Sequence, residues 1–229
     1  TNIGSATQEN RNIVALMDLG ENDPYNPVIT GYGNPEAIFP DNESNNIFTI
    51  VNVNQVRDIN GVNAYMNTTG LVAGTDYEKI ENARLLAPTE YTYNSKLGFI
   101  SLNSSLNDDQ VLAVAYQYTV LGQDSVYQVG EFSNGGIAAP GCLVVKLLKG
   151  TAQNTKVPLW DLMMKNVYAI GGYQVNPDDF RLDVLYKSDA MGVPAGYFTE
   201  GSQQGIPLIR VLNMDNLNAN SDPEPDGFF

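Results

Sequence analysis

The stretch Val111-Leu-Ala-Val-Ala-Tyr-Gln-Tyr-Thr-Val-Leu121 carries no charge, and most of its residues are β-branched, aromatic or aliphatic. Such residues favour strands because they pack well on a pleated, half-buried surface. A strand that is apolar on both faces is typical of the centre of a sandwich rather than of its edge. The stretch therefore predicts a central strand in a mainly β, antiparallel, sandwich-like fold with one or two short helices.

The segments on either side of this stretch extend the prediction. Tyr91-Thr-Tyr93 and Phe99-Ile-Ser-Leu102 flank a turn that ends at Gly98, which is the pattern of a β-hairpin. After a second turn, Val126-Tyr-Gln-Val-Gly-Glu-Phe132 predicts another strand. Consecutive strands with short turns favour an antiparallel meander.

The remaining elements are predicted from periodicity and from turn residues. Further strands are expected at residues 47–56, 142–148, 180–186 and 206–212, the last at an edge because it contains Pro207. A short helix is expected at residues 58–67, with an irregular loop as the alternative, and another at residues 158–168. A Gly- and Pro-rich stretch after Asn134 favours a division into a β-rich subdomain at 1–136 and a second at 137–229. One continuous domain is the alternative.

The composition excludes several classes of site. The chain of 229 residues has no His and one Cys, so it cannot form a Ser-His-Asp triad, an imidazole-ligated zinc site, an internal disulfide or an iron–sulfur cluster. Its 26 acidic and 12 basic residues give a formal charge of −14. That charge argues against nucleic acid as a partner and against adsorption to an anionic lipid surface.

The sequence contains neither a signal-peptide pattern at its start nor an apolar run of about 18 residues, the length that predicts a transmembrane helix. It begins without Met and stops abruptly after Asp226-Gly-Phe-Phe229. We interpret it as a piece of a longer protein.

The acidic tail offers one candidate cation site. Asp215, Asn218, Asp222 and Asp226 supply closely spaced oxygen atoms, and Ca²⁺ takes six to eight oxygen ligands. The spacing is not that of an EF-hand, so the alternative is a solvated loop whose Asn and Asp side chains cap local turns. The loop at residues 18–23 is a second oxygen-rich cluster, for which an Asx-turn before Pro24 is the stronger interpretation. No other cofactor is predicted.

We expect no enzymatic activity. Gly201-Ser-Gln-Gln-Gly205 lacks the register of a nucleophile elbow, and the chain has no His to act as its base. The pairs Asp108-Asp109 and Asp178-Asp179 are adjacent in sequence, and neighbours on a strand point to opposite faces. A hydrolase built on carboxylates is thus without a supporting motif.

Several blocks of the sequence resemble the SprA/Sov family. The most specific block is Leu159-Trp-Asp-Leu-Met-Met-Lys-Asn-Val-Tyr168. Other blocks are Met17 to Pro27, Glu81 to Leu102, Asp109 to Tyr118, Tyr127 to Phe132, Asp179 to Tyr186, and Pro207 to Phe228. Together they extend from about Asn12 to the end of the chain.

The resemblance implies a function that composition and spacing do not reveal. The family is the outer-membrane translocon of the Bacteroidetes type IX secretion system, a giant β-barrel that exports folded cargo and is required for gliding motility. This chain is too short to be that barrel, so the resemblance implies a soluble, non-catalytic insertion or cap segment. Its expected work is to shape the pore mouth or to bind other type IX outer-membrane proteins and secreted cargo.

The resemblance also implies a location at the outer membrane or cell surface. The extracellular side is favoured over the periplasmic side, because barrel loops are longer on the outside. A calcium-dependent or carbohydrate-binding β-sandwich module is the alternative function.

Overall fold

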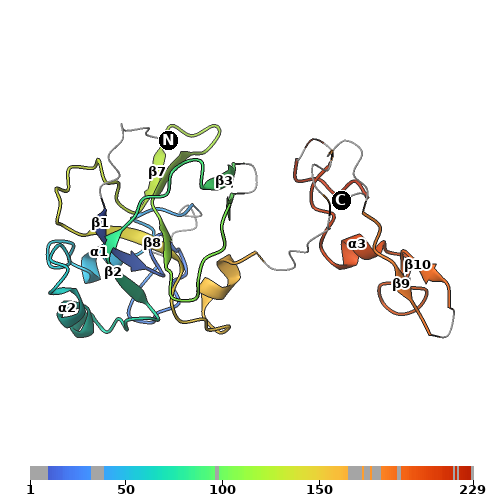
Figure 1. Ribbon diagram of the computed structural model, residues 1–229, viewed down its shortest axis with the longest axis horizontal. Coiled ribbons are helices and arrows are strands. Elements are labelled where there is room, and N and C mark those ends of the chain that lie inside the picture. Colours follow the sequence, from blue (N-terminus) through green and yellow to red (C-terminus); the bar gives the residue numbers. More distant parts are fainter. Residues whose placement is uncertain are drawn as a thin grey trace. The chain divides into compact units, whose positions relative to one another are not determined.

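The computed structural model describes residues 10–31, 39–95, 98–164, 172, 176, 182–189, 192–218, 220 and 222–227. Strand residues outnumber helical residues, 26% against 11%, which confirms the mainly β prediction. The chain forms two compact units, shown in Figure 1. Unit 1 comprises Thr1–Ala87 and Ser104–Val167, and unit 2 comprises Pro88–Asn103 and Tyr168–Phe229.

A four-stranded sheet forms the centre of unit 1. Its strands, in spatial order, are β2 (Tyr77–Ala83), β1 (Arg11–Leu16), β8 (Leu143–Lys149) and β5 (Leu112–Val114). The central pair, β1 and β8, is parallel, and the two outer pairs are antiparallel. The predicted strand at 142–148 is thus confirmed as β8.

The central pair of strands, β1 and β8, is buried on both faces of the sheet. On β1, Val14 and Leu16 belong to one apolar cluster and Ala15 to another, as the two-residue period of a strand requires. β8 alternates in the same way, with Val144 in the first cluster and Val145 in the second. Each fully buried aliphatic side chain contributes about 1.5–3 kcal/mol. The β1–β8 pair is therefore the core of the unit.

Two helices contribute to the first cluster. These are α1 (Ile47–Ile50) and α2 (Val62–Thr69), which bury Ile47, Val62 and Met66. α2 confirms the helix predicted at 58–67, with its start shifted toward the C-terminus. The second cluster includes Leu159 of the 3₁₀ helix η1 (Pro158–Leu162). The rest of the helix predicted at 158–168 is absent up to residue 164, and residues 165–168 lie outside the described part.

The strand predicted at residues 47–56 is wrong, because the segment begins as α1 and continues in turns. The apolar side chains that it buries are Ile47, Val51 and Val56, and the first two are four residues apart. That spacing places both on one face of a helical turn. In addition, the Asn45 side chain accepts a hydrogen bond from the Ile47 N–H at 2.9 Å, which favours a helical start.

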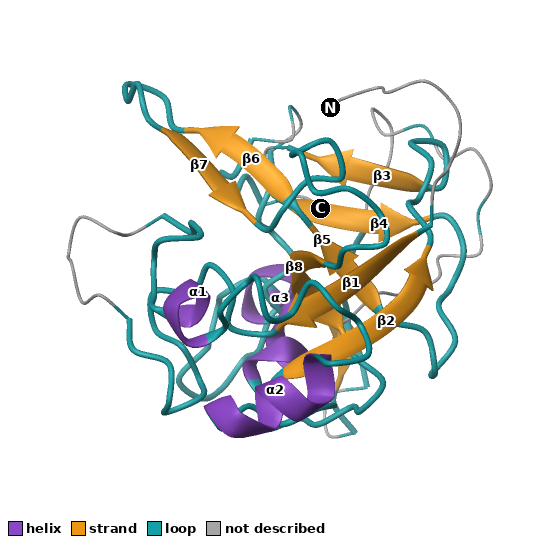
Figure 2. Cartoon of the chain, turned by 90° about the vertical axis from the view of Figure 1, so that its left-hand side faces the viewer, coloured by secondary structure: helices purple, strands orange, loops and turns teal. Residues whose placement is uncertain are grey.

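The stretch at residues 111–121, predicted as a central strand, does not form one. It divides at Ala115 into β5 and β6 (Tyr116–Thr119), and β6 pairs with β7 (Val126–Val129) in a separate two-stranded ribbon. β5 is the last strand of the four-stranded sheet. The division arises because the pairing partner changes at Ala115 from β8 to β7. Figure 2 shows the ribbon extending beyond the sheet.

Unit 2 is built from short elements. They are the hairpin β3 (Tyr91–Asn94) and β4 (Phe99–Leu102), the pair β9 (Tyr186–Lys187) and β10 (Pro194–Ala195), and helix α3 (Leu208–Val211). The hairpin was predicted and is confirmed. Of the strand predicted at 180–186, only Tyr186 is in a described strand, and residues 180 and 181 lie outside the described part.

The edge strand predicted at residues 206–212 is wrong, because α3 occupies its centre. Pro207 directly precedes the helix, and the fixed φ of Pro suits a helix start as well as an edge strand. The helix buries Leu208 and Ile209. Among the described helices of the chain, none is long and apolar enough to cross a membrane.

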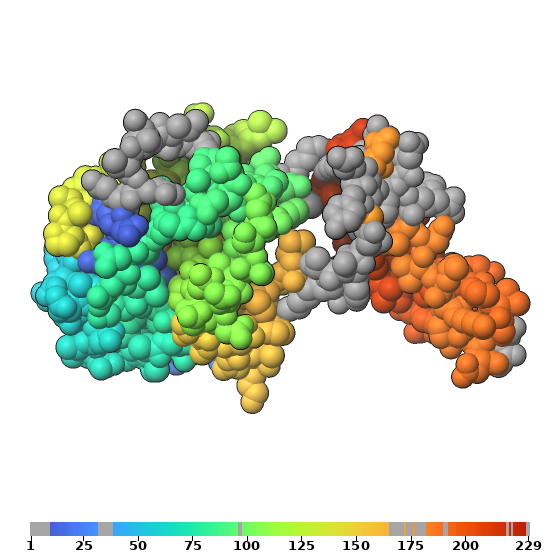
Figure 3. Space-filling model, viewed as in Figure 1, coloured from blue at the N-terminus to red at the C-terminus, as the bar shows by residue number. Residues whose placement is uncertain are grey.

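The division of the chain differs from a boundary at 136/137. β8 follows that boundary in sequence but pairs with β1, which precedes it by about 130 residues. Unit 1 therefore contains segments from both predicted halves. Figure 3 shows a consequence at the surface, where the yellow segment near residue 135 borders the cyan segment near residue 50.

Substitutions at two glycines, Gly130 and Gly122, can test the packing near Ala115, where the strand partner changes from β8 to β7. Gly130 and Gly122 both have positive φ, +80° and +86°. A Cβ at Gly130 would lie 3.0 Å from the Ala115 Cβ and 3.3 Å from the Val145 Cα, whereas none of the described atoms lies within 4 Å of a Cβ at Gly122. We expect Gly130→Ala to lower the free energy of unfolding by about 1–3 kcal/mol more than Gly122→Ala does.

Trp160, the single tryptophan, belongs to unit 1, so its fluorescence during urea unfolding reports on that unit. Equal losses from the two substitutions would show that the backbone conformation alone, and not the contact with Ala115 and Val145, requires glycine at residue 130.

Candidate functional site

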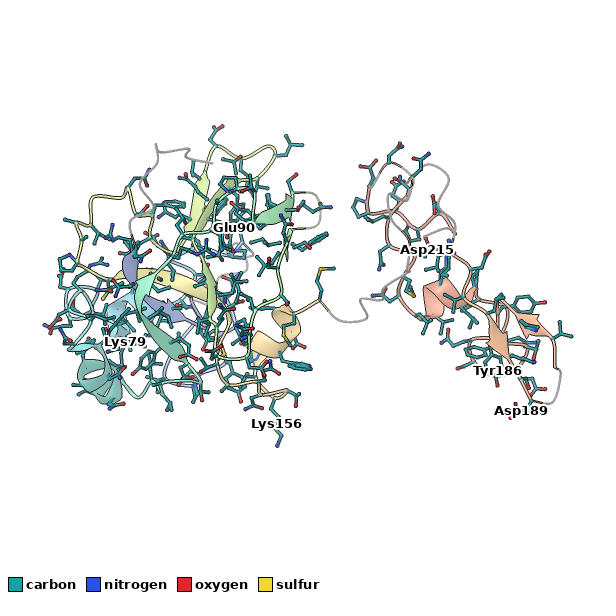
Figure 4. All side chains as sticks on the ribbon, in the orientation of Figure 1. Lys79, Glu90, Lys156, Tyr186, Asp189 and Asp215 are labelled. Atoms are coloured by element: carbon teal, nitrogen blue, oxygen red, sulfur yellow. The ribbon has the colours of Figure 1, made fainter. Side chains whose placement is uncertain are left out.

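Asp215, the first of the predicted cation ligands, is held by an arginine. Its side chain is fully buried in unit 2, in the loop that follows α3 (Figure 4). Arg210 on α3 donates its Nε–H to Asp215 Oδ2 at 2.7 Å. The backbone N–H groups of Asp226 and Gly227 each donate to the same carboxylate at 3.1 Å. The Asp215 carboxylate therefore joins α3 to the end of the acidic tail.

The other three predicted ligands lie in the same tail but have different roles. Asn218 Oδ1 accepts hydrogen bonds from the N–H groups of Asn220 and Asp222, which makes it the cap of a local turn. Asp226 contacts Asp215 through its backbone N–H. Within the described residues, no three Asp, Glu or Cys side chains form a group that could hold a metal ion. Calcium binding here stays a prediction.

The electrostatics of Asp215 follow from these contacts. The hydrogen bond from Arg210 lowers the pKa of the Asp215 carboxyl below its ordinary value. Burial opposes this shift, and the two backbone N–H groups reinforce it. A shallow hollow of about 380 Å³ borders the pair and is lined by Arg210, Asn213, Asp215, Asn216 and Pro225. Asp215 is thus an anion already neutralised by a protein cation.

In unit 1, the loop at residues 18–23 also uses its carboxylate internally. Asp18 is buried, and its two oxygens accept hydrogen bonds from the N–H groups of Tyr25 and Asn26 at 3.1 and 2.9 Å. Asn45 donates its side-chain amide to the backbone oxygens of Asp18 and Glu21. These bonds reach residues seven and eight positions after Asp18, so the carboxylate organises the backbone beyond Pro24 and does not form the two-residue bond of an Asx-turn.

An ion pair connects two distant segments of unit 1. Arg57 donates two hydrogen bonds of 2.6 Å to the carboxylate of Glu131, which lies 74 residues later. Arg57 also donates to the backbone oxygen of Cys142, and Glu131 accepts from the Val144 N–H. The hydrogen bond with Glu131 raises the pKa of Arg57 further above its usual value. The pair holds the residues after β7 and the start of β8 against the segment before α2.

Two more cations of unit 1 point inward. Arg11 is buried and donates to the backbone oxygens of Ser133, Ile137 and Gly141. Lys146, buried in the middle of β8, donates to the Met17 backbone oxygen and to the Glu21 carboxylate.

Cys142 is buried, and burial raises the pKa of its thiol. The single cysteine therefore has the environment of a packing residue.

The β6–β7 ribbon carries a row of aromatic rings on one face. Tyr116 stacks on Tyr118 with ring centroids 5.9 Å apart, and Tyr118 stacks on Tyr127 at 5.3 Å. Phe39 continues the row beside Tyr127, also at 5.3 Å. The Tyr118 hydroxyl donates to the Pro40 backbone oxygen at 2.8 Å. The row fixes the segment 39–42 against the ribbon.

The spacing of the tyrosines in the sequence indicates most of this row. Tyr116 and Tyr118 are two residues apart, so they share a face of any strand, and Tyr127 opposes Tyr118 across a short turn. Phe39 has no comparable signal, because 77 residues separate it from Tyr116. The Arg57–Glu131 pair is equally invisible in sequence, since no local spacing connects its members.

The ion pair gives a prediction about stability. Glu131→Gln leaves one acceptor oxygen for three donors and places an amide N–H₂ against the guanidinium. We expect it to lower the free energy of unfolding of unit 1 by about 2–3 kcal/mol, measured by Trp160 fluorescence in urea. The matched control is Glu81→Gln, because Glu81 is exposed and pairs with Lys79 at 3.3 Å. It should cost about 0.5 kcal/mol or less. Equal effects would contradict a structural role for Glu131.

Asp215 gives a prediction about pH. The folded pKa lies below the unfolded value of about 3.9, so the contacts of Asp215 stabilise the tail above that pH and are lost as the pH falls through the folded pKa. We expect the amide NMR shifts of Asp226 and Gly227 to stay constant from pH 7 to about 4 and to move below it. The Asn220 amide, bonded to the non-titrating Asn218, is the control. Asp215→Asn should abolish the transition, and a transition that persists in this variant would rule out Asp215 as its origin.

Comparison with known proteins gives no relative from which a function could be transferred. No protein-family model matches the chain, and no curated protein sequence matches it.

Proposed function

We propose that the chain is a non-catalytic segment of a SprA/Sov-type translocon, the outer-membrane channel of type IX secretion. In this role it offers surfaces near the pore mouth to other type IX outer-membrane proteins and to secreted cargo. The sequence blocks quoted above suggest the family, and the geometry supports a structural rather than a chemical use of the charged residues.

The observation that carries the proposal is the engagement of the buried charges. Arg11 and Lys146 bind backbone groups of distant segments, and Asp18 binds the N–H groups of Tyr25 and Asn26 later in its own loop. The Arg57–Glu131 pair also binds backbone groups of a distant segment, and the Arg210–Asp215 pair binds backbone N–H groups of the acidic tail. A catalytic acid or base instead needs a charged or polar group directed at a reacting molecule. In this chain these groups hold loops in place.

The charge of the chain supports a location on the cell exterior. A formal charge of −14 keeps an exposed segment solvated and limits nonspecific adsorption. Repulsion from anionic lipid headgroups also keeps such a segment away from the membrane surface. We propose the extracellular side of the outer membrane for it.

The alternative of a calcium-dependent or carbohydrate-binding module has less support. Asp215 is occupied by Arg210. Tyr118 is stacked between Tyr116 and Tyr127, so its ring faces meet other rings rather than an approaching sugar. The same row gives rigidity to a ribbon that could contact protein.

The proposal predicts that export depends on the fold of unit 1. In the complete translocon, Val144→Asp places a carboxylate in the centre of the first apolar cluster, where burial of an unpaired charge costs several kcal/mol. We expect export of type IX cargo into the medium to fall, with translocon still detected in the outer membrane. Glu81→Gln, on the exposed side of β2, is the control and should export normally.

A second measurement tests the location. Gly122, in the β6–β7 turn, has open space around it among the described atoms, so a protease site inserted there should leave the fold intact. Cleavage in intact cells is expected. Cleavage only after the outer membrane is opened would place the segment in the periplasm.

The export experiment has its own contradicting outcome. Normal export of type IX cargo by the translocon with Val144→Asp would contradict the proposed role.

A further inference from the structure

The β6–β7 ribbon has one closed and one open edge. On the β7 side, Gln128 donates its N–H to Asp41 Oδ2 at 2.9 Å and accepts the Asn42 N–H at 2.8 Å. The Asn42 side chain accepts the Gly130 N–H at 2.8 Å. Residues 41 and 42 therefore cover this edge as a further strand would.

The β6 edge follows from the same contacts. Because the Gln128 N–H and C=O point away from β6, the opposed pair Gln117–Gln128 is a non-hydrogen-bonded pair. Thr119–Val126, two residues along, is of the same kind. The backbone groups of Gln117 and Thr119 thus point outward from the free edge of β6. Both residues are exposed, and neither has a hydrogen-bond partner among the described residues for these groups.

Apart from the short length of β6, four residues, this edge shows none of the usual protections against pairing with another chain within the described part of the chain. Natural edge strands carry Lys, Pro, bulges or a covering segment. Tyr116-Gln-Tyr-Thr-Val-Leu121 has neither charge nor Pro, and Leu121 at its end is fully exposed, at 101%. One edge of the ribbon is covered by residues 41 and 42, while no segment among the described residues covers the other.

We propose that the free edge of β6 is a docking site for an extended segment of a different polypeptide, which adds as a strand beside Gln117 and Thr119. Strand addition supplies affinity through main-chain hydrogen bonds and specificity through alternate side chains. On one face the added strand meets Tyr116 and Tyr118, so it should be apolar at every second residue. This inference deepens the proposed function, since it identifies how a partner or cargo would be held.

Charge argues for a basic partner rather than a second copy. From residue 97 to residue 145 the chain has no Lys or Arg, and its carboxylates there are Asp108, Asp109, Asp124 and Glu131. Pairing two copies through β6 would bring these acidic segments together, with each chain at −14. A segment with Lys or Arg beside its alternating core is complementary to this edge.

The test uses the full chain and a synthetic peptide of ten residues. The peptide has six central residues that alternate Val and Thr, and two Lys at each end. Thr119→Pro removes the outward N–H of Thr119 and leaves that of Gln117 in place. Val126→Pro is the matched control, because it removes the outward N–H at the same rung on the opposite edge. By fluorescence anisotropy, we expect Thr119→Pro to weaken peptide binding by about tenfold or more and Val126→Pro to leave it unchanged.

Hydrogen exchange on the unmodified chain gives a test that does not depend on whether the Pro variants fold. Hydrogen exchange at the Gln117 and Thr119 amides should slow when the peptide is added, while exchange at Val126 should not change. A peptide with Glu in place of Lys should bind more weakly. No binding of the Lys peptide, or equal loss in both Pro variants, would overturn the proposal.

Sedimentation of the chain without peptide tests the alternative that a second copy of the chain pairs with this edge. A concentration-dependent dimer that Thr119→Pro abolishes would make the edge a self-interface and overturn the proposal. These binding assays do not depend on the identity of the translocon. If the peptide does not bind but export still depends on the fold of unit 1, the docking proposal is wrong and the proposed function stands. If the peptide binds but export does not depend on unit 1, the proposed role in secretion is wrong and the docking proposal stands.

Discussion

The parallel pairing of β1 with β8 is the contact on which unit 1 depends. The two strands are about 130 residues apart in sequence, with Ile13 opposite Leu143 and Leu16 opposite Lys146. Both are buried on both faces, so each face of the sheet needs its own covering layer. The chain between the two strands supplies α1 and α2, which cover one face, and also β2 and β5, which extend the sheet on either side. Closing so long a connection is entropically costly, and the burial of the β8 side chains is what offsets that cost.

The same pairing explains where the few cations are used. Arg11 and Arg57 come from the first quarter of the sequence and donate to backbone oxygens at residues 133–142, next to the start of β8. Lys146 emerges from β8 itself and returns to Met17, just after β1. Each of these cations satisfies carbonyl groups that the sheet leaves without a strand partner.

Sequence patterns predicted the parts of the fold in which side-chain period and structure agree. β8 and the β3–β4 hairpin fall into this group, since their apolar runs are bounded by clear turn residues. At residues 47–56 and 206–212, the abundance of β-branched and aliphatic residues predicts strands. Packing of one buried face decided otherwise in both segments, with Ile47 and Val51 one turn apart and with Leu208 and Ile209 buried beside Pro207. Intrinsic preference is weak over four or five residues, so tertiary contacts override it.

The candidate surfaces were less predictable than the fold. Asp215, Asn218, Asp222 and Asp226 do lie in one loop region, yet the cation that Asp215 binds is Arg210, which a search for oxygen ligands alone does not consider. The Arg57–Glu131 pair joins segments 74 residues apart, and its members have no mutual spacing to detect. By contrast, the Tyr116–Tyr118–Tyr127 row follows from the two-residue period of a strand.

The uncharged edge of β6 and the acidic character of the chain are compatible because they act over different distances. At physiological salt, charges interact over about 8 Å, so acidic chains repel one another before their edges come into contact. A backbone hydrogen bond forms only at about 2.9 Å and is indifferent to the sign of distant charges. An edge strand without charge would be a risk of self-association in a neutral protein. In a chain with a formal charge of −14, repulsion between copies protects that edge, while a partner of opposite charge is drawn toward it. The acidity of the surface and the bare edge therefore form one selective arrangement.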